Sequence, residues 1–303
     1  MAFTAADVKT LREMTGAGMM DCKKALTAAE GNMDKAVEWL REKGIAASAK
    51  KASRIAAEGM AYAAVIDGVG VVVEVNAETD FVAKNEKFVD FVKGIAATVV
   101  ANNPANLDAL LECTYAGSDV TVAAKQTEMI QVIGENIKVR RFHLFAENTS
   151  VSYIHAGGKI GVLVNLAVEG DIDATEIGKD VAMQIAALNP RFWDKSQVTQ
   201  DILDEEKKIM MAQMANDPKM ANKPEQVIEK IVVGKLNKFY VENCLLQQEF
   251  VKDNQFSVEK YIASAAKALG GKVTFVDAIR FEKGEGIEKK EDDFAAEVAS
   301  MIK

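Results

Sequence analysis

Two runs rich in β-branched residues, at positions 62–66 and 69–75, are joined by the dipeptide Asp67-Gly68. Asp-Gly readily adopts the left-handed backbone angles of a two-residue turn, so the two runs are predicted to pair as an antiparallel hairpin. Apolar residues then recur at helical spacing between Phe88 and Val99. Because such a helix must bury its apolar face against the sheet, this part of the chain is predicted to be a helix-on-sheet layer, which indicates an α+β fold.

The rest of the chain extends and then repeats this organisation. A helix near 121–133 and a strand at 137–145 complete the first unit. The expected elements of the second unit are strands at 151–154 and 159–168 around the turn His155-Ala156-Gly157-Gly158, a helix at 174–188, a strand pattern that resumes near Phe250, a helix at 258–269 and a strand at 273–281.

Three short amphipathic helices are predicted at the start of the chain, and together they form a compact module. Thr4 and Asn32 are suited to cap the first and third helices, because their side-chain oxygens can accept hydrogen bonds from free backbone N–H groups. The core of so small a module is limited, so we expect it to depend on its neighbours or on a partner. An Ala-rich connector follows, which is expected to be helical or flexible.

A polar, antiparallel helical hairpin is predicted to interrupt the second unit. Ser196 is expected to cap its first helix, and its second helix is expected at 225–241. Asp204 and Lys208 are four residues apart on the first helix, so they are predicted to form an exposed ion pair.

The end of the chain is predicted to form a helix after a glycine-rich hinge, with Phe294, Val298 and Met301 on its apolar face. A terminal amphipathic helix of this kind docks on its own chain or on a partner. The complete predicted division is a three-helix module at 1–45, a connector at 46–58, a first α+β core subdomain at 59–148, a second one at 149–193 and 244–283, the inserted hairpin at 194–243 and the C-terminal helix at 284–303.

The charge balance excludes a protein that binds nucleic acid over its whole surface. The 303 residues contain 37 Lys and Arg against 45 Asp and Glu, a formal net charge of −8. Affinity for a duplex rests on cationic side chains that neutralise phosphates, so any RNA contact would be local. The basic connector with Lys43, Lys50, Lys51 and Arg54 is the place where such a contact could lie.

No window approaches the roughly 18 consecutive apolar residues of a membrane helix, and the N-terminus lacks the regions of a secretion signal. We therefore expect a cytoplasmic protein without membrane contact. Its three cysteines, Cys22, Cys113 and Cys244, are far apart and odd in number, which argues against a disulfide framework and a zinc site. They are expected to be small buried residues.

The sequence offers little catalytic chemistry. Neither of its two histidines, His143 and His155, lies in a nucleophile or zinc-binding motif. His143 is expected to be a strand residue, whereas His155 is either a recognition residue or an ordinary turn residue. The glycine patterns at 16–21 and 157–160 lack the residues of dinucleotide and P-loop sites. No catalytic residue, metal site or cofactor is therefore predicted.

Residues 79–85, Thr-Asp-Phe-Val-Ala-Lys-Asn, lie between a predicted strand and a predicted helix and leave two interpretations open. In the first, Thr79 or Asp80 caps the helix and Phe81 packs inward as a hydrophobic staple. In the second, Phe81 protrudes as a wedge that anchors in a partner's pocket, and Asp80 places a charge against a specific group of that partner.

Three separated motifs resemble the bacterial translation elongation factor Ts family. They are LREMTGAGMMDCKKAL at 11–26, TDFVAKN at 79–85, and the C-terminal set RF at 280–281, GEGIE at 284–288 and DFAAEV at 293–298. The resemblance spans the chain and favours the wedge interpretation of Phe81. It implies a UBA-like N-terminal module and a guanine-nucleotide exchange factor for elongation factor Tu, the GTPase that carries aminoacyl-tRNA to the ribosome.

The resemblance also implies roles for particular residues. The stretch Thr79, Asp80, Phe81 and Val82 would intrude beside the magnesium site of the GTPase and dislodge the ion, so that GDP leaves and GTP can bind, without covalent chemistry. Further partner contacts would come from Arg12, Met19 and Met20 in the N-terminal module, from His155, Gly157 and Gly158 in the second sheet unit, and from Phe294 and Val298 in the terminal helix. Ala156 stands where the family often has glycine.

The state of assembly and two other function classes stay open. Family members use the inserted hairpin for self-association or for further contact with the elongation complex, so a homodimer or a 2:2 complex is compatible with the resemblance. A factor that remains on the aminoacyl-tRNA complex until GTP hydrolysis is compatible with it too. The other classes are an RNA- or ribosome-binding module that uses the basic connector, and a small-molecule enzyme that uses Asp80 and His155, which nothing in the sequence places together.

Overall fold

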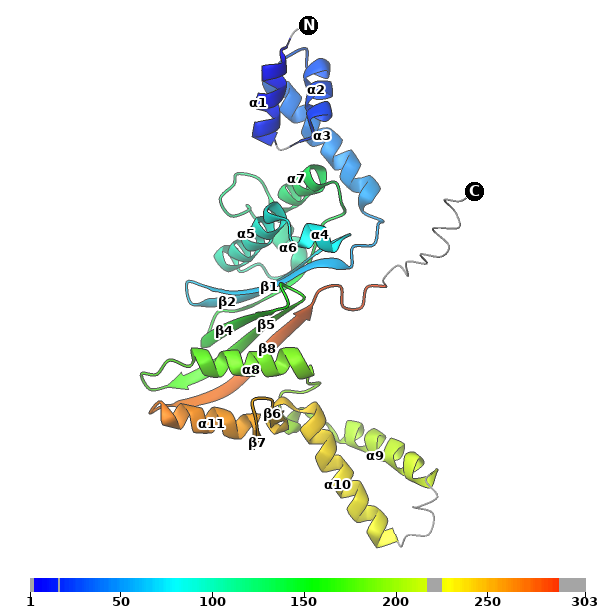
Figure 1. The fold of residues 1–303 in the computed structure, drawn as a ribbon, viewed down its shortest axis with the longest axis vertical. Coiled ribbons are helices and arrows are strands. Elements are labelled where there is room, and N and C mark those ends of the chain that lie inside the picture. The colour runs from blue at the N-terminus through cyan, green and yellow to red at the C-terminus, as the bar shows by residue number, and fades with distance from the viewer. Residues whose placement is uncertain (1–2, 16, 217–224, 289–303) are drawn as a thin grey trace.

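The computed structural model describes residues 3–15, 17–216 and 225–288, which form an elongated molecule (Figure 1). Three helices form its N-terminal end: α1 Ala5–Thr15, α2 Met19–Ala28 and α3 Met33–Lys51. Asn32 caps α3 as predicted, since its side-chain oxygen accepts a hydrogen bond from the backbone N–H of Lys35 at 3.0 Å. The three helices enclose a small core of their own, which includes Leu11, Cys22 and Leu26.

The first half of the predicted connector is helical. α3 continues to Lys51, because this segment is rich in alanine, the strongest helix former. The ammonium of Lys51 donates a hydrogen bond to the carbonyl of Ile130 at 3.5 Å, so the end of α3 is attached to helix α7 of the following unit.

The first unit is a three-stranded antiparallel sheet in the order β1-β2-β3, covered on one face by helices. Its elements are β1 Glu58–Ile66, β2 Val69–Ala77, α4 Asp80–Ala83, α5 Glu86–Asn102, α6 Leu107–Glu112, α7 Val122–Ile133 and β3 Lys138–Phe145. The predicted hairpin is confirmed, because Asp67 and Gly68 have φ angles of 50° and 83°. Helix α6 was not predicted, since its six residues are too few to show a period.

Apolar residues of α5 pack on the strands to form the first core. Phe88, Phe91 and Ile95 are buried against Val73 and Val75 of β2. The offsets of 0, 3 and 7 place the three α5 residues on one face of the helix, as the sequence predicted. This packing fixes the position of the chain between β2 and α5, where residues 79–85 lie.

The second unit has the same architecture, with a sheet in the order β4-β5-β8. Its elements are β4 Thr149–His155, β5 Ile160–Glu169, α8 Thr175–Leu188, α11 Val258–Ala268 and β8 Lys272–Glu282. The sequence suggested that the strand pattern near Phe250 continues this sheet, but the structure shows that it does not. It forms a separate two-stranded sheet of β6 Glu249–Phe250 and β7 Asp253–Ser257.

The two three-stranded sheets pack face to face, with helices on their outer faces (Figure 1). Small residues Ala61 and Ala63 of β1 meet Leu163 of β5 and Phe281 of β8 at this interface. Antiparallel sheets bury their inner faces in this way when side chains from both sheets interdigitate. The α+β fold class is confirmed.

The inserted hairpin consists of α9 Gln200–Ala215 and α10 Glu225–Asn243. Ser196 does not cap α9, because it lies inside a short 3₁₀ helix, η1 Lys195–Gln197. Asp194 caps η1, and α9 begins after Thr199. The predicted ion pair is also wrong in its partner, since Asp204 pairs with Lys207 at 3.6 Å instead of Lys208.

Two general expectations can be compared with the part of the chain that the structure describes. Cys22 and Cys244 are buried as expected, whereas Cys113 is only half-buried. Within residues 3–15, 17–216 and 225–288, no helix combines the length and the apolar character needed to cross a membrane.

Candidate functional site

Residues 79–85 contain a single turn of helix, α4 Asp80–Ala83, between β2 and α5. Thr79 caps this helix, α4, because its hydroxyl oxygen accepts a hydrogen bond from the backbone N–H of Val82 at 3.4 Å. Val82 is 8% exposed and belongs to the first core, whereas Phe81 is 81% exposed. Thr79 therefore has the capping position of the first interpretation, but Phe81 does not pack inward as a staple.

The turn is held from below by the loop that follows α7. The carboxylate of Glu135 accepts hydrogen bonds from the backbone N–H groups of Glu78 and Thr79 at 3.1 Å and 3.0 Å, and from the Thr79 hydroxyl at 2.7 Å. No sequence pattern marked Glu135, because it lies 56 residues from Thr79 and follows an ordinary helix end at Gly134.

Asp80 is exposed and forms an ion pair with one cationic side chain. Its carboxylate pairs with the ammonium of Lys84 at 3.1 Å, one helical turn further on. The hydrogen bond from Lys84 and the positive charges of Lys84 and Lys283 lower the pKa of Asp80 below its ordinary value. Asp80 is therefore a carboxylate at neutral pH, and a partner cation could take the place of Lys84.

An open groove of about 560 Å³ adjoins Phe81. It is lined by Phe81, Val82, Asn85, Glu86, Lys87, Val132 and Ile133. The groove leaves space beside the phenyl ring, so a partner group can approach the ring from this side.

The predicted contact residues of the N-terminal module lie on its surface. Arg12 is exposed, and Met19 and Met20 are 50% and 63% exposed at the start of α2. They do not contribute to the module's core, which Leu11 and Cys22 help to form. Exposed methionines offer an adaptable apolar surface to a partner.

The turn between β4 and β5 presents His155 to solvent. The Nδ1 atom of His155 lies 3.0 Å from the hydroxyl oxygen of Tyr153. Gly157 and Gly158 have φ angles of 65° and 99°, and Ala156 has a φ of 47°, which is unusual for a residue with a Cβ atom. Ala156 therefore keeps the left-handed conformation that a glycine would adopt at this position.

The remaining predicted contacts, Phe294 and Val298, lie outside the described residues. The segment that leads to them is fixed to the core, however. Buried Glu74 of β2 accepts hydrogen bonds from the backbone N–H of Gly284 at 2.8 Å and from Arg140 Nη1 at 2.9 Å, and Arg141 Nε lies 2.5 Å from its other oxygen.

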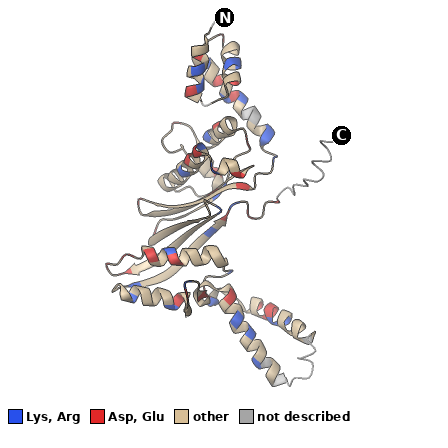
Figure 2. Ribbon diagram, in the orientation of Figure 1, with Lys and Arg blue, Asp and Glu red and all other residues tan. Residues whose placement is uncertain are grey.

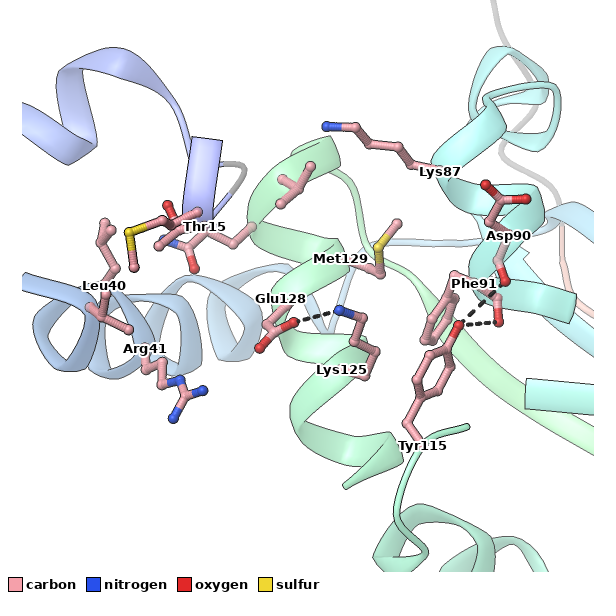
Figure 3. A pocket seen from close by; sticks show the side chains of 14 residues that line it. Thr15, Leu40, Arg41, Lys87, Asp90, Phe91, Tyr115, Lys125, Glu128 and Met129 are labelled. Atoms are coloured by element: carbon pink, nitrogen blue, oxygen red, sulfur yellow. Dashed lines mark hydrogen bonds and ion pairs between the residues drawn. The ribbon is translucent and has the colours of Figure 1, made fainter. Parts of the chain in front are cut away.

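A cleft of about 390 Å³ separates the N-terminal module from α5 and α7 (Figure 3). Its polar side chains are largely engaged with neighbours on the same side of the cleft. Lys125 pairs with Glu128 at 3.0 Å, and the Tyr115 hydroxyl donates to the backbone carbonyls of Asp90 and Phe91. Burial raises the pKa of Tyr115 to about 12, so the phenol is neutral near pH 7.

The groove beside Phe81 and the cleft beside the N-terminal module are lined by neither Asp80 nor His155, so these cavities give the two residues no shared site. In the same part of the chain, no group of three or more His, Cys, Asp or Glu side chains is arranged to hold a metal ion. Among the predicted residues that the structure describes, Phe81, Arg12, Met19, Met20 and His155 are exposed at separate places on the molecule, whereas Val82 and Gly158 are buried.

Charged residues of both signs are interspersed along the helices (Figure 2). Two cations of the basic connector are engaged within the chain, since Lys51 bonds to the carbonyl of Ile130 and Arg54 pairs with Glu78 at 3.5 Å. Lys43 lies over the ring of Trp39, with its ammonium 5.4 Å from the ring centre. The connector thus presents less free positive charge than its sequence suggested.

Comparison with known proteins agrees with the resemblance. The family model described as Elongation factor TS matches residues 78–285. The chain is 48% identical to elongation factor Ts of Syntrophotalea carbinolica over all of both chains. It is 49% identical to elongation factor Ts of Trichlorobacter lovleyi, over 99% of this chain and 98% of the relative, and 50% identical to that of Clostridium perfringens, over 98% of each. The match over most of the chain and the identity over its full length show that the chain belongs to the elongation factor Ts family.

Proposed function

We propose that this chain is a guanine-nucleotide exchange factor for elongation factor Tu in translation elongation. It binds the GDP-bound GTPase, dislodges the magnesium ion and promotes the release of GDP, so that GTP can bind. It performs no covalent chemistry, and it acts in the cytoplasm, where translation takes place. Its membership of the elongation factor Ts family supports this proposal.

Exchange follows from the linkage between two ligands of the GTPase. P-loop GTPases hold the diphosphate with backbone N–H groups and a lysine, and hold magnesium with a Ser or Thr and further ligands, so GDP leaves slowly. A factor that binds the nucleotide-free GTPase better than the GDP-bound form weakens GDP binding. The affinity for GDP falls by the same factor by which bound GDP lowers the affinity of the GTPase for the exchange factor.

The exposure of Phe81 is the observation that carries the proposal. A phenyl ring that is 81% exposed, on a turn whose next residue is 8% exposed in the core, is a projecting group on a firm support. We assign Phe81 the steric displacement of groups beside the magnesium site. We assign Asp80 an electrostatic role. Its negative charge can attract the groups of the GTPase that hold the magnesium ligands in place, and this weakens magnesium binding.

Other residues are proposed to hold the GTPase without touching the nucleotide. These are Arg12, Met19 and Met20 of the N-terminal module, the turn with His155, Gly157 and Gly158, and the C-terminal residues Phe294 and Val298. We also propose the division into subdomains given in the sequence analysis. The inserted hairpin is proposed to form a homodimer or a 2:2 complex with the GTPase. Sedimentation of the chain, alone and with elongation factor Tu, tests the assembly.

An RNA- or ribosome-binding role is the second candidate. It would rest on the connector, where Lys51 and Arg54 already bond to groups of the same chain. We therefore expect weak RNA binding, and a steep loss of affinity with rising salt would be needed to support this role.

Release of fluorescent GDP from elongation factor Tu tests the proposed function directly. Replacement of Phe81 by alanine should slow factor-stimulated release about 30-fold or more, the cost typical of losing an aromatic anchor. Phe256→Ala is the matched control, since Phe256 is also an exposed phenylalanine, at 38%, but lies on β7. Excess magnesium should blunt the effect of the parent protein, and release that Phe81→Ala stimulates as fast as the parent would refute the wedge.

Asp80→Asn tests the charge separately. The amide keeps the size of the side chain but removes the charge that pairs with Lys84. We expect a smaller reduction in the GDP release rate than for Phe81→Ala, because the ring still enters the partner.

A further inference from the structure

The turn that carries Phe81 is too short to hold its own conformation. Helix α4 has four residues, whereas isolated helices shorter than about 12 residues are marginal in water. Two contacts with the rest of the molecule therefore determine the direction in which Phe81 leaves the surface. One is the burial of Val82 and Ala83, and the other is the contact with Glu135.

Glu135 binds the turn at the point where α4 begins. Its carboxylate accepts two backbone N–H groups, from Glu78 and Thr79, and the hydroxyl of Thr79. A carboxylate acceptor makes these bonds shorter and stronger than bonds between neutral groups. Because Thr79 is the capping residue of α4, fixing it also fixes the axis of the turn and the position of Phe81.

The residue after Glu135 attaches the same loop to the connector, just beyond the end of α3. The backbone N–H of Asn136 donates to a Glu78 carboxylate oxygen at 2.6 Å, and its side-chain amide donates to the carbonyl of Arg54 at 2.8 Å. Arg54 in turn pairs with Glu78 at 3.5 Å. The loop therefore touches both the base of the turn and the residues that follow α3.

We propose that Glu135 is a positioning residue for nucleotide exchange, which acts through Phe81 and does not itself touch the partner. The inference rests on the proposed function. Loss of the three hydrogen bonds lets Thr79 move, so Phe81 samples directions in which it does not reach the magnesium site. The factor still binds through its other contacts, and the step that fails is the displacement of magnesium.

Glu135→Gln tests this role with a minimal change of size. The amide carries no charge, so the bonds from the N–H groups of Glu78 and Thr79 lose their charge assistance, and the Thr79 hydroxyl must turn from donor to acceptor to face the NH₂ group. Stopped-flow release of fluorescent GDP is measured against the concentration of the full chain. We expect the maximal rate of GDP release to fall about tenfold, because a small misplacement of the ring weakens its effect on the magnesium site. The concentration of the factor that gives half of the maximal rate should stay within about threefold of the parent's.

Glu128→Gln is the matched control, because Glu128 lies on α7 and loses the same charge, from its pair with Lys125 at 3.0 Å. Circular dichroism confirms that each variant is folded. A tenfold effect of both substitutions would overturn the assignment, and so would a Glu135→Gln variant that changes only the half-saturating concentration or nothing.

A double-mutant cycle shows whether Glu135 acts through the ring. In a Phe81→Ala background, Glu135→Gln should change the maximal rate by less than about twofold, because there is no ring left to position. A further tenfold reduction in that background would refute the inference. A Phe81→Ala variant as fast as the parent would instead refute the proposed function, so the two failures are distinguishable.

Discussion

Replacement of Glu74 by glutamine should destabilise the core far more than replacement of any exposed acid of the same cluster. Glu74 is completely buried in β2 and accepts hydrogen bonds from Arg140, Arg141, Asn76 and the backbone N–H of Gly284. Glutamine keeps one acceptor oxygen but removes the charge and turns the second oxygen into a donor. The arginines then lose the carboxylate that compensates their partial burial.

The expected loss of unfolding free energy depends on how deeply Glu74 and its two arginine partners are buried. Breaking a buried ion pair by removing one partner costs about 3–5 kcal/mol. The arginine side chains are 26% and 31% exposed, so water recovers part of this loss and we expect about 3 kcal/mol, the low end of the range. For a cooperative unit of roughly 150–250 residues, this lowers the unfolding midpoint by about 6–12 °C.

Thermal and urea unfolding followed by circular dichroism measures this loss. Glu285→Gln is the matched control, because Glu285 pairs with Arg141 at 3.0 Å in the same cluster but is 45% exposed, and exposed pairs contribute at most about 1 kcal/mol. The urea dependence of the unfolding free energy should stay unchanged in both variants. A midpoint for Glu74→Gln within about 2 °C of the Glu285→Gln midpoint would show that the buried cluster contributes little net stability.

Three further outcomes are expected. Gly284→Ala should cost at least about 2 kcal/mol, because Gly284 has a φ of 70° and a Cβ there would lie 2.0 Å from the carbonyl oxygen of Ala57; an unchanged melting temperature would contradict this. Ala156→Gly should raise stability by about 1 kcal/mol, since it removes a Cβ from a residue at a φ of 47°, and a lower melting temperature would contradict it. Burial lowers the pKa of His143, so the unfolded chain binds its proton more tightly and stability falls as the pH drops below about 6.5, the ordinary histidine pKa. His143→Gln should weaken this acid dependence in urea unfolding measured between pH 5 and pH 8, whereas His155→Gln, at an exposed turn, serves as the control.

Elements whose determinants are close in sequence could be predicted. The β1–β2 hairpin follows from Asp67-Gly68, and the end of α7 follows from Gly134 in the left-handed conformation. Ser196 shows the limit of such signals, because Ser196 and Thr199 are both good capping residues, and the structure places Ser196 inside η1 and Thr199 at the start of α9.

Interactions between distant residues could not be predicted from local patterns. Glu74 stands in a run of valines, where a single acid in a buried strand hints at a partner but does not identify one. Its partners Arg140 and Arg141 follow 66 and 67 residues later, and they meet it only because β3 pairs with β2. Glu135 and Thr79 are related in the same way, since they are 56 residues apart in the sequence and are joined by hydrogen bonds in the fold.

The exposure of Phe81 is the point at which local preference and structure differ most. Spacing alone suits an inward staple, and burying a phenylalanine side chain contributes about 1.5–3 kcal/mol. The protein does not gain this stabilisation from Phe81, because its ring is 81% exposed and the neighbouring Val82 is buried in the core instead. The same free energy becomes available when a partner covers the ring, and it corresponds to about a 10- to 150-fold difference in an equilibrium constant. A residue kept out of the core at this cost can work only if its direction is fixed, which is why the neighbouring bonds of Thr79 to Glu135 matter as much to the proposed exchange as the ring itself.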